Sequence, residues 1–380
     1  MTRMPHPRSL GDFAVIAVFL VLLLAPAVLA LTGHAGADTA FIESHEQRRP
    51  FVAPPVRTGA LATGGYERDL ERQIADGFPL RSLLIASYDY AKFAWFGAST
   101  SPNVVRGRDG WLFFGAEERK YVTGTYKPSD ADLARVADVF AARARRHARN
   151  GTHYILVFAP NKSTVYASEA PAWYRPKAPT PLDRLIPMLR ARGVTTVDVR
   201  AALRRAARDG EVYSRGDTHW NDAGAVLAYR AVVAAAFGTG LRDAVPAGTT
   251  RGERAPGDLL NLSGVGTHFD NSVVKLDYAH RAHEETVSVI TVHGIDPSLV
   301  HVRITSVNDP KLPAGALVGD SFSVALAPMF AEDFRLFSHL VLPSVNAARE
   351  DGSPLPGAKP DVVVQELVER SLVFSDTFGR

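Results

Sequence analysis

Three residues of this chain have the types that nucleophilic catalysis by serine requires. Asp217 and His219 stand in the sequence Asp-Thr-His-Trp, and Ser321 follows about a hundred residues later in Gly-Asp-Ser-Phe-Ser. A free serine hydroxyl is a weak nucleophile near neutral pH, so it needs a base that takes its proton and a carboxylate that orients this base and stabilises its cation. The three residue types therefore predict a Ser-His-Asp triad.

The spacing and surroundings of these residues favour this interpretation. In an extended segment residues two apart project to the same side, so the carboxylate of Asp217 and the imidazole of His219 are expected to touch. Residues 314–318 are typical of a buried strand, Gly319 allows a sharp turn, and residues 322–330 have helical apolar spacing. Each motif alone is more typical of a turn, a helix cap or a structural histidine. Their joint occurrence favours catalysis.

Composition excludes several function classes. The 380 residues are 46% hydrophobic and 22% charged, which is an ordinary globular balance. The net charge is only +3, and the one basic cluster, 143–149, is expected to be the solvated face of a helix, so no nucleic acid partner is predicted. The absence of cysteine excludes disulfides, thiol catalysis and thiolate metal sites. The histidines form no ligand-spaced cluster, so no metal or other cofactor is predicted.

The N-terminus predicts export. Arg3 and Arg8 precede an uncharged run over 13–31 that is long enough to cross the hydrocarbon core of a membrane. The positive flank predicts that the N-terminus stays in the cytoplasm and the rest is exported. A cleaved signal peptide is the alternative, because residues 35–37 resemble an A-x-A cleavage site. We favour an uncleaved anchor, and so a single-pass protein of the inner membrane whose catalytic domain is periplasmic or otherwise extracytoplasmic.

The rest of the chain indicates an α/β fold. We expect a cytoplasmic start and transmembrane anchor or signal over 1–37, a Pro- and Gly-rich linker over 38–65, and a catalytic domain over 66–380. From about residue 129 helices alternate with short apolar strands, which indicates a parallel sheet flanked by helices. Residues 241–310 depart from this pattern and are expected to form a β/loop insertion. In such a sheet, sites form at the carboxyl ends of the strands, where Ser321 falls.

The individual elements are expected as follows. Helices are expected over 66–75, 79–96, 129–150, 182–192, 201–208 and 222–237, and strands over 103–105, 111–114, 154–158, 194–199, 314–318, 336–342 and 361–367.

Several segments together resemble a known family. They run in order across residues 66–370 and comprise 107–113, 160–166, 217–221, 257–259, 319–322 and 363–370. In these segments the chain resembles the alginate O-acetyltransferase J and X (AlgJ/AlgX) family, SGNH-hydrolase-like proteins that acetylate exported polysaccharides. The resemblance implies an SGNH-hydrolase-like fold, with Ser321 as the acyl-accepting nucleophile, His219 as general base and acid, and Asp217 as its orienting carboxylate. Common GDS-type esterases place the serine first and a D-x-x-H pair last, whereas here the D-x-H pair precedes the serine.

Other residues are candidates for binding the substrate or an oxyanion. The backbone N–H of Ser321 or Phe322 and the side-chain amide of Asn161 are candidate oxyanion donors. Lys162 is a candidate cation for an anionic polymer, although 161–163 also fits a plain helix-initiating turn. Tyr166, Tyr213 and Arg215 are candidates for lining a sugar groove, or are ordinary loop residues.

Five further residues are expected to be structural. Trp111, Phe113 and Phe114 are expected in the core of a hairpin rather than stacked on sugars. Asp258 is expected to be a cap or turn residue, and Asp320 to fix the turn that carries the nucleophile.

The sequence thus predicts a membrane-anchored O-acetyltransferase that acts on a polysaccharide acceptor. The resemblance implies a membrane-bound O-acyltransferase as the supplier of acetyl groups. Two alternatives stay open, an extracytoplasmic carbohydrate acetylesterase with the same triad and a non-catalytic subunit of a polysaccharide export complex. Transferase and esterase differ only in whether a sugar hydroxyl or water attacks the acyl-enzyme.

Overall fold

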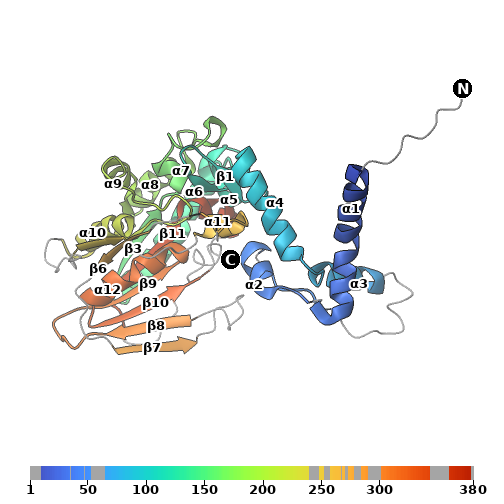
Figure 1. The fold of residues 1–380 in the computed structure, drawn as a ribbon. Coiled ribbons are helices and arrows are strands. Elements are labelled where there is room, and N and C mark those ends of the chain that lie inside the picture. Colours follow the sequence, from blue (N-terminus) through green and yellow to red (C-terminus); the bar gives the residue numbers. More distant parts are fainter. Residues whose placement is uncertain are drawn as a thin grey trace, which may run out of the picture. The chain divides into compact units, whose positions relative to one another are not determined.

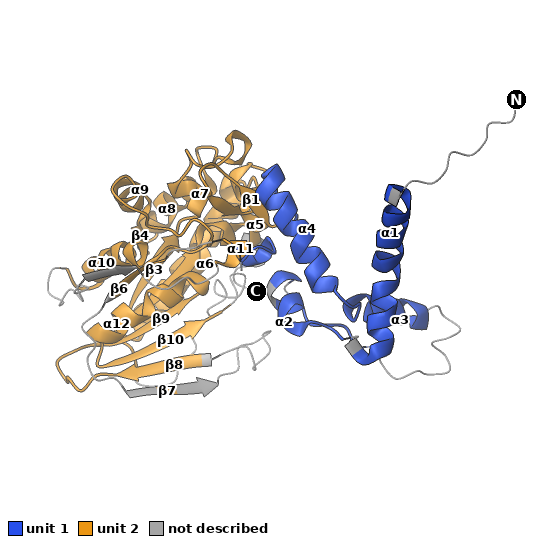
Figure 2. Ribbon diagram, viewed as in Figure 1, with its two compact units in different colours: residues 1–100, 261–268 blue, residues 101–260, 269–380 orange. Residues whose placement is uncertain are grey.

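The computed structural model divides the chain into two compact units (Figure 2). Residues 1–100 and 261–268 form the first, and residues 101–260 and 269–380 form the second. The residues described are 10–34, 36–46, 48–52, 65–238, 248–251, 257–266, 268–269, 273–277, 284–289, 301–342 and 359–377. Arg3, Arg8 and Ala35 lie outside them, as do residues 47 and 53–64 of the expected linker and much of the expected insertion.

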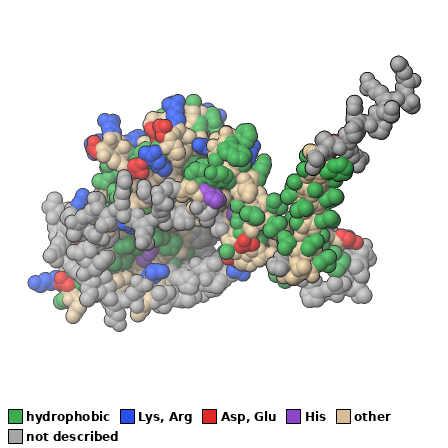
Figure 3. Space-filling model, viewed as in Figure 1, with side chains coloured by type: hydrophobic (Ala, Val, Ile, Leu, Met, Phe, Trp, Pro, Cys, Tyr) green, Lys and Arg blue, Asp and Glu red, His purple; other side chains and the backbone are tan. Residues whose placement is uncertain are grey.

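The first unit begins with the apolar helix that the sequence predicts. Helix α1 spans Leu10–Leu29 and continues into a π-helix over Ala30–His34. Residues Gly11–Gly33 have a mean hydropathy of 3.0 and none of this segment is buried (Figure 3). The helix is therefore long and apolar enough to cross a membrane, a property that signal sequences near an N-terminus share.

Three further helices of the first unit follow. The short α2 spans Thr39–Phe41, and α3 (Gly65–Asp76) and α4 (Arg81–Phe96) confirm the two helices predicted from periodicity (Figure 1). The carboxylate of Asp76 at the end of α3 accepts hydrogen bonds from both terminal nitrogens of Arg48, at 2.5 and 2.7 Å. This bidentate pair ties the described part of the expected linker to the helix.

The second unit holds the remaining elements. Its strands are β1 (Val104–Arg106), β2 (Leu112–Phe114), β3 (His153–Ala159), β4 (Thr195–Asp198), β5 (Gly248–Arg251), β6 (Val274–Asp277), β7 (Glu284–Val289), β8 (His301–Ser306), β9 (Ala314–Gly319), β10 (Leu336–Val341) and β11 (Val362–Val368). Its helices include α5 (Glu117–Val122), α6 (Asp130–Arg149), α7 (Lys162–Val165), α8 (Pro181–Ala191), α9 (Arg200–Ala206), α10 (Asp222–Phe237), α12 (Ala327–Asp333) and the 3₁₀ turns η4 (Ala172–Tyr174), η6 (Ser321–Ala325) and η7 (Glu369–Thr377). Of α11 (Asp258–Leu262), residues 258–260 belong to this unit.

A seven-stranded sheet organises this unit, in the order β4-β3-β11-β9-β10-β8-β7. The first five strands are parallel, as predicted, but β8 and β7 join the edge in antiparallel pairing. The expected parallel sheet flanked by helices is confirmed, and strands of the expected insertion extend it in antiparallel pairing into a mixed sheet. The reason is visible in their composition, because β7 and β8 alternate polar and apolar residues as antiparallel strands with one solvated face do, whereas β9 and β11 are buried throughout.

Helices cover both faces of the sheet (Figure 1). On one face α6 and α8 pack against each other and against β3 and β4, and Arg143 of α6 donates a hydrogen bond to Gln365 of β11 at 2.9 Å. On the other face α10 and α12 pack over β3, β4 and β10. Arg143 is buried, so the basic cluster that we expected to be solvated has one member in the core.

The parallel strands end side by side where the polar motifs begin. Strand β11 lies between β3 and β9, and Val368 at its end pairs with Ala159 at the end of β3. The residues that follow β3, β11 and β9 therefore meet at one edge of the sheet, as the topology of parallel sheets requires. The β1–β2 hairpin buries Trp111 and Phe113, which confirms their predicted place in the hairpin core.

Candidate active site

Asp217, His219 and Ser321 form one line of hydrogen bonds. The Nδ1 atom of His219 lies 2.8 Å from Oδ1 of Asp217, and its Nε2 atom lies 2.7 Å from Oγ of Ser321. With the proton on Nδ1, the imidazole donates to the carboxylate and Nε2 accepts the serine proton. This arrangement can turn the hydroxyl of Ser321 into a nucleophile.

Ser321 sits on a turn that leaves strand β9. Oδ1 of Asp320 accepts the N–H of Phe322 at 3.0 Å, and Oδ2 accepts the N–H of Val368 at 2.9 Å. The side chain of Asp320 thus joins the turn to the end of β11 and caps η6. This is the turn-fixing role that the sequence predicts for Asp320, and it leaves Ser321 exposed at the start of η6.

Gly319 is required at this turn for space rather than for its backbone angles. A Cβ atom there would lie 2.6 Å from Cβ of Ser323 and 2.7 Å from Oε2 of Glu366, closer than real Cβ atoms approach. Gly319 is absent from the described glycines with positive φ. The sequence therefore identified the right residue, but a glycine is needed at position 319 because η6 approaches β11 closely.

A second serine supports the turn from the other side. Oγ of Ser323 donates to the carbonyl oxygen of Asp320 at 2.7 Å and lies 2.9 Å from Nε2 of His339. Since the hydroxyl proton of Ser323 is used, His339 is the donor of that second bond. Burial, together with the charge of Arg303, lowers the pKa of His339 to about 4, so this imidazole is neutral near pH 7.

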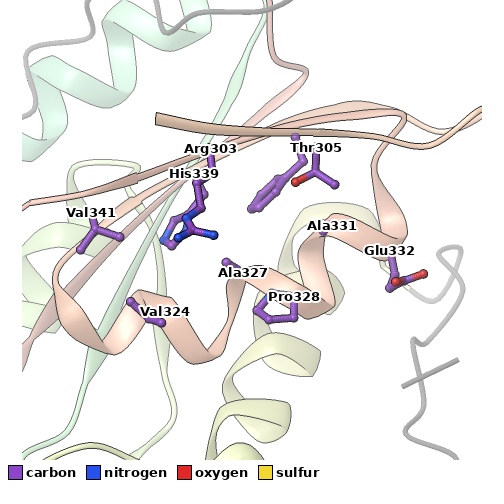
Figure 4. A pocket seen from close by; sticks show the side chains of 10 residues that line it. Arg303, Thr305, Val324, Ala327, Pro328, Ala331, Glu332, His339 and Val341 are labelled. Atoms are coloured by element: carbon purple, nitrogen blue, oxygen red, sulfur yellow. The ribbon is translucent and has the colours of Figure 1, made fainter. Parts of the chain in front are cut away.

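His339 also faces a cavity of about 490 Å³ between the sheet and α12 (Figure 4). Its floor comes from β8 and β10 and its cover from η6 and α12, and its lining residues are Arg303, Thr305, Val324, Ala327, Pro328, Ala331, Glu332, Phe337, His339 and Val341. The cavity therefore borders the turn that carries the nucleophile.

The segment that carries Asp217 and His219 is a loop between α9 and α10. Its only regular pairing among the described residues is one bridge between Tyr213 and Trp220. Oδ1 of Asp217 accepts both the backbone N–H of His219, at 2.8 Å, and its ring Nδ1. The predicted contact is therefore made through a bend that the carboxylate closes, not through an extended strand.

Trp220 links this loop to the nucleophile. Its Nε1 donates to the carbonyl oxygen of Phe322 at 3.0 Å, and the two rings pack edge to face with centroids 5.4 Å apart. The ring of Phe322 also lies 4.8 Å from the ring of His219. The base and the nucleophile are therefore held together by an aromatic contact as well as by their own hydrogen bond.

Asp258 brings a second carboxylate to the base, which the sequence assigned only to a cap or turn. Its Oδ1 accepts the N–H of Thr218 at 2.6 Å, its N–H donates to Oδ2 of Asp217 at 3.1 Å, and its Oδ2 lies 3.8 Å from Nδ1 of His219. Ligand atoms of Asp217, His219 and Asp258 lie within 4.8 Å of one another, a set that could hold a metal ion. Here Nδ1 of His219 is already bonded to Asp217 while Nε2 faces Ser321, which is the arrangement of a triad.

The two carboxylates have opposite pKa shifts. Burial opposes charge on Asp217, but its hydrogen bond to His219 and the charge of that imidazole lower its pKa to about 2. Burial, together with the neighbouring charge of Asp217, raises the pKa of Asp258. Burial also acts against a charged His219, but the hydrogen bond and charge of Asp217 outweigh it and raise the pKa of His219.

Lys162 and Asn161, which follow β3, are both buried. The ammonium of Lys162 is 1% exposed and donates to the carbonyl oxygens of Ser214, Arg215 and Asp217, so it faces the protein rather than a polymer. The N–H of Asn161 donates to Oε2 of Glu369 at 3.0 Å. The side-chain amide of Asn161 is fully buried and has no hydrogen-bond partner among the described residues.

The remaining candidate residues occupy different environments. Tyr213 is fully buried and donates to the carbonyl of Pro160, and Tyr166 stacks on Trp111 with centroids 4.0 Å apart. Arg215 is half exposed and pairs with Glu211 at 2.7 Å. Of the residues expected to line a groove, only Arg215 offers a large part of its side chain to solvent. The N–H of Phe322 is taken by Asp320, which leaves the N–H of Ser321 as the backbone candidate for an oxyanion.

Known proteins are similar to this chain in sequence or in fold. The chain is 26% identical to the "Probable alginate O-acetylase AlgJ" of Pseudomonas putida over 358 residues, which are 85% of this chain and 88% of that protein. It is 28% identical to the protein of the same description in Pseudomonas aeruginosa over 316 residues, 79% of this chain and 74% of that one. The structure of Bacillus cereus PatB1 with a sulfonyl adduct matches 73% of this chain and 99% of its own length, with a TM-score of 0.51 and 15% identity.

A family model covers the larger part of the second unit. Residues 104–354 match the family described as "SGNH hydrolase-like domain, acetyltransferase AlgX". The matched region contains both the loop of Asp217 and His219 and the turn of Ser321. The chain belongs to this SGNH-hydrolase-like acetyltransferase family.

Proposed function

We propose that this protein is a membrane-anchored O-acetyltransferase that moves acetyl groups through a Ser321 acyl-enzyme to hydroxyls of an exported or cell-envelope polysaccharide. The observation that carries the proposal is the hydrogen-bonded line from Asp217 through His219 to Ser321. Membership of an acetyltransferase family supports acetyl as the transferred group.

The first half of the reaction acylates the enzyme. Oγ of Ser321 attacks the acetyl carbonyl of a donor while Nε2 of His219 takes the serine proton, and Asp217 stabilises the imidazolium. The tetrahedral intermediate collapses when the bond to the leaving group breaks, and His219 returns the proton to that group. The raised pKa of His219 suits this role, because a more basic imidazole takes the proton of Ser321 more readily.

The second half transfers the acetyl group to the acceptor. A sugar hydroxyl attacks the carbonyl of the acetyl-enzyme as Nε2 of His219 takes its proton, and the bond to Oγ of Ser321 breaks with return of that proton. Each intermediate carries an oxyanion. We assign the N–H of Ser321 and the amide of Asn161 as its donors, since a buried amide without a partner is costly unless a ligand uses it.

The setting of the reaction follows from the N-terminal helix. We place residues 1–37 as a cytoplasmic start and inner-membrane anchor, 38–65 as a linker, and 66–380 as the catalytic domain outside the cytoplasm. A membrane-bound O-acyltransferase supplies the acetyl groups in this scheme. The names of the AlgJ relatives make alginate the first acceptor to test.

The test uses the full chain in detergent micelles with a chromogenic acetyl ester, with and without alginate oligosaccharides. We expect acetylated oligosaccharide to form with the parent and not with Ser321→Ala. Release of acetate that no acceptor changes would instead support an acetylesterase with the same triad. Equal behaviour of the parent and Ser321→Ala would contradict both enzymatic functions and support a non-catalytic subunit.

A further inference from the structure

We propose that Lys162 is a positioning residue for this reaction, whose ammonium holds the loop of Asp217 and His219 in its catalytic geometry through three backbone carbonyls. The proposal rests on the proposed function of the triad. It also gives Lys162 a role different from binding an anionic polymer. The proposal is based on the hydrogen bonds of the Nζ atom, on the burial of Lys162 and on the hydrogen bonds that lead from Asp217 to His219.

The three contacts of Nζ match the chemistry of an ammonium group. Nζ lies 3.0 Å from the carbonyl oxygen of Ser214, 3.0 Å from that of Arg215 and 2.5 Å from that of Asp217. An ammonium has three N–H donors and no acceptor, so each carbonyl receives one hydrogen bond. A neutral apolar side chain in this place would leave three convergent carbonyl dipoles without donors.

The place of Lys162 in the fold makes it a firm support. It begins α7 three residues after the end of β3, so its backbone is fixed by the sheet. The rings of Trp111 and Phe113 lie 5.6 and 5.7 Å from Nζ, an arrangement that favours a cation and excludes water. The ammonium therefore connects the rigid sheet to a loop that has little regular structure of its own.

The connection leads directly to the base. The residue whose carbonyl oxygen is bound most closely is Asp217, and the carboxylate of the same residue binds both the backbone and the ring of His219. A shift of the Asp217 backbone would therefore move the imidazole relative to Ser321. Misplacement of about 1 Å is enough to cost about a hundredfold in rate.

The charges around Lys162 give the proposal a pH signature. Burial lowers the pKa of Lys162 to about 8, although Asp217, Asp258, Glu118 and Glu211 all favour its charged form. Above this pH a neutral amine offers two N–H donors to three carbonyls and turns a lone pair toward one of them. We therefore expect kcat to fall above about pH 8 while KM changes little, because the loop positions the base and not the substrate.

The experiment compares the full-length parent with Lys162→Met and Lys162→Arg, and with Lys120→Met as the matched control on an exposed face of α5. Hydrolysis of a chromogenic acetyl ester gives kcat and KM from pH 6 to 10, and an arylsulfonyl fluoride reports the reactivity of Ser321 by mass spectrometry. Lys162→Met should lower both kcat and the sulfonylation rate by about a hundredfold. Lys120→Met should match the parent, and Lys162→Arg should retain activity without the alkaline fall, because its guanidinium stays charged.

The outcomes separate this inference from the proposed function. If neither the parent nor Ser321→Ala turns over the ester or reacts with the fluoride, the proposed function fails. If the parent is active and folded Lys162→Met keeps its kcat and its sulfonylation rate, the positioning role fails. Should Lys162→Met not fold, as judged by circular dichroism, the parent profile still decides, since a kcat that stays constant to pH 10 overturns the proposal.

Discussion

The two segments that form the active site are held in different ways. The turn of Ser321 leaves a buried strand, and its contacts run to the neighbouring strand β11 through Asp320 and Glu366. The loop of His219 lies between two helices, and it accepts hydrogen bonds from the ammonium of Lys162 and donates one to the carboxylate of Asp258. The nucleophile is thus placed by the sheet, whereas polar side chains, the buried Lys162 among them, help to place the base.

A buried carboxyl group completes the support of the nucleophile's turn. Oε2 of Glu366 accepts the N–H of Asp320 at 3.2 Å. Burial and the neighbouring charge of Asp320 raise the pKa of Glu366 well above its usual range, which favours the protonated form of this carboxyl. Protonation reduces the repulsion between the two adjacent carboxyl groups of the turn.

The largest effect should come from removing the nucleophile itself. Ser321→Ala should lower kcat on the order of 10⁶-fold, because loss of a serine nucleophile removes the acyl-enzyme route altogether. Burst kinetics with a chromogenic acetyl ester measure this, and the melting temperature should stay near that of the parent because Ser321 is exposed. An acyl-enzyme that still forms in the variant would show that the reacting group is elsewhere.

The second largest loss of kcat should come from removing the carboxylate of Asp217, in the loop that carries His219. Asp217→Asn should lower kcat by about 10⁴-fold, as replacing the carboxylate of a triad favours the wrong tautomer of the histidine. Asp209→Asn, on an exposed turn, is the matched control.

The same variant should change the pH profile in a defined direction. His219 acts as a base only when neutral, so activity is lost as pH falls through its raised pKa. Removal of the Asp217 charge lowers that pKa, so the acid limb of kcat/KM should move to lower pH. An acid limb that does not move would mean that another group controls it.

A substitution of Asp320, in the turn of Ser321, should lower kcat less than a substitution of Asp217 does. Asp320→Ala leaves the N–H groups of Phe322 and Val368 without their acceptor, which should cost about 1–3 kcal/mol of unfolding free energy for each buried group left unpaired. The resulting displacement of Ser321 should lower kcat by about a hundredfold. Urea unfolding and steady-state kinetics measure the two effects, and a loss of stability without a loss of kcat would contradict the view that the sheet positions the nucleophile.

The contrast between the turn of Ser321 and the loop of His219 also explains which features could be predicted from the sequence. The strands, most helices and the strand-turn-helix setting of Ser321 follow from apolar periodicity and from turn residues, which report local structure and burial. Periodicity says nothing of which polar group meets a backbone carbonyl in three dimensions. A lysine is normally solvated, so the burial of Lys162 was not predictable from its type.

Asp258 and the edge of the sheet were missed for related reasons. Asp258 lies about forty residues from Asp217 in the chain, and only the path of the loop and α11 brings the two together. Its segment, Gly-Asp-Leu, is among those that resemble the family, which was the one signal that it matters. Strands β7 and β8 have a short alternating pattern of polar and apolar residues, yet this pattern alone does not indicate which sheet the two strands join.

The smallest loss of kcat should come from removing the charge of Asp258, the second carboxylate near His219. Asp258→Asn keeps an oxygen that accepts the N–H of Thr218, so the loop retains its support. What the variant loses is charge, and the Asp258 carboxyl lies 3.8 Å from Nδ1 of His219, compared with 2.8 Å for that of Asp217. Burial and the neighbouring charge of Asp217 also raise the pKa of Asp258, whereas the pKa of Asp217 is lowered.

We therefore expect Asp258→Asn to lower kcat by less than about tenfold, or about 1.4 kcal/mol, and to move the acid limb less than Asp217→Asn does. Asp258→Ala, which removes the acceptor as well, should cost more, because the N–H of Thr218 is then left unpaired. Kinetics of the two variants side by side separate charge from support. If Asp258→Asn costs as much as Asp258→Ala, charge and not the hydrogen bond to the loop is what Asp258 contributes, and the base is held by fewer side chains than the structure indicates.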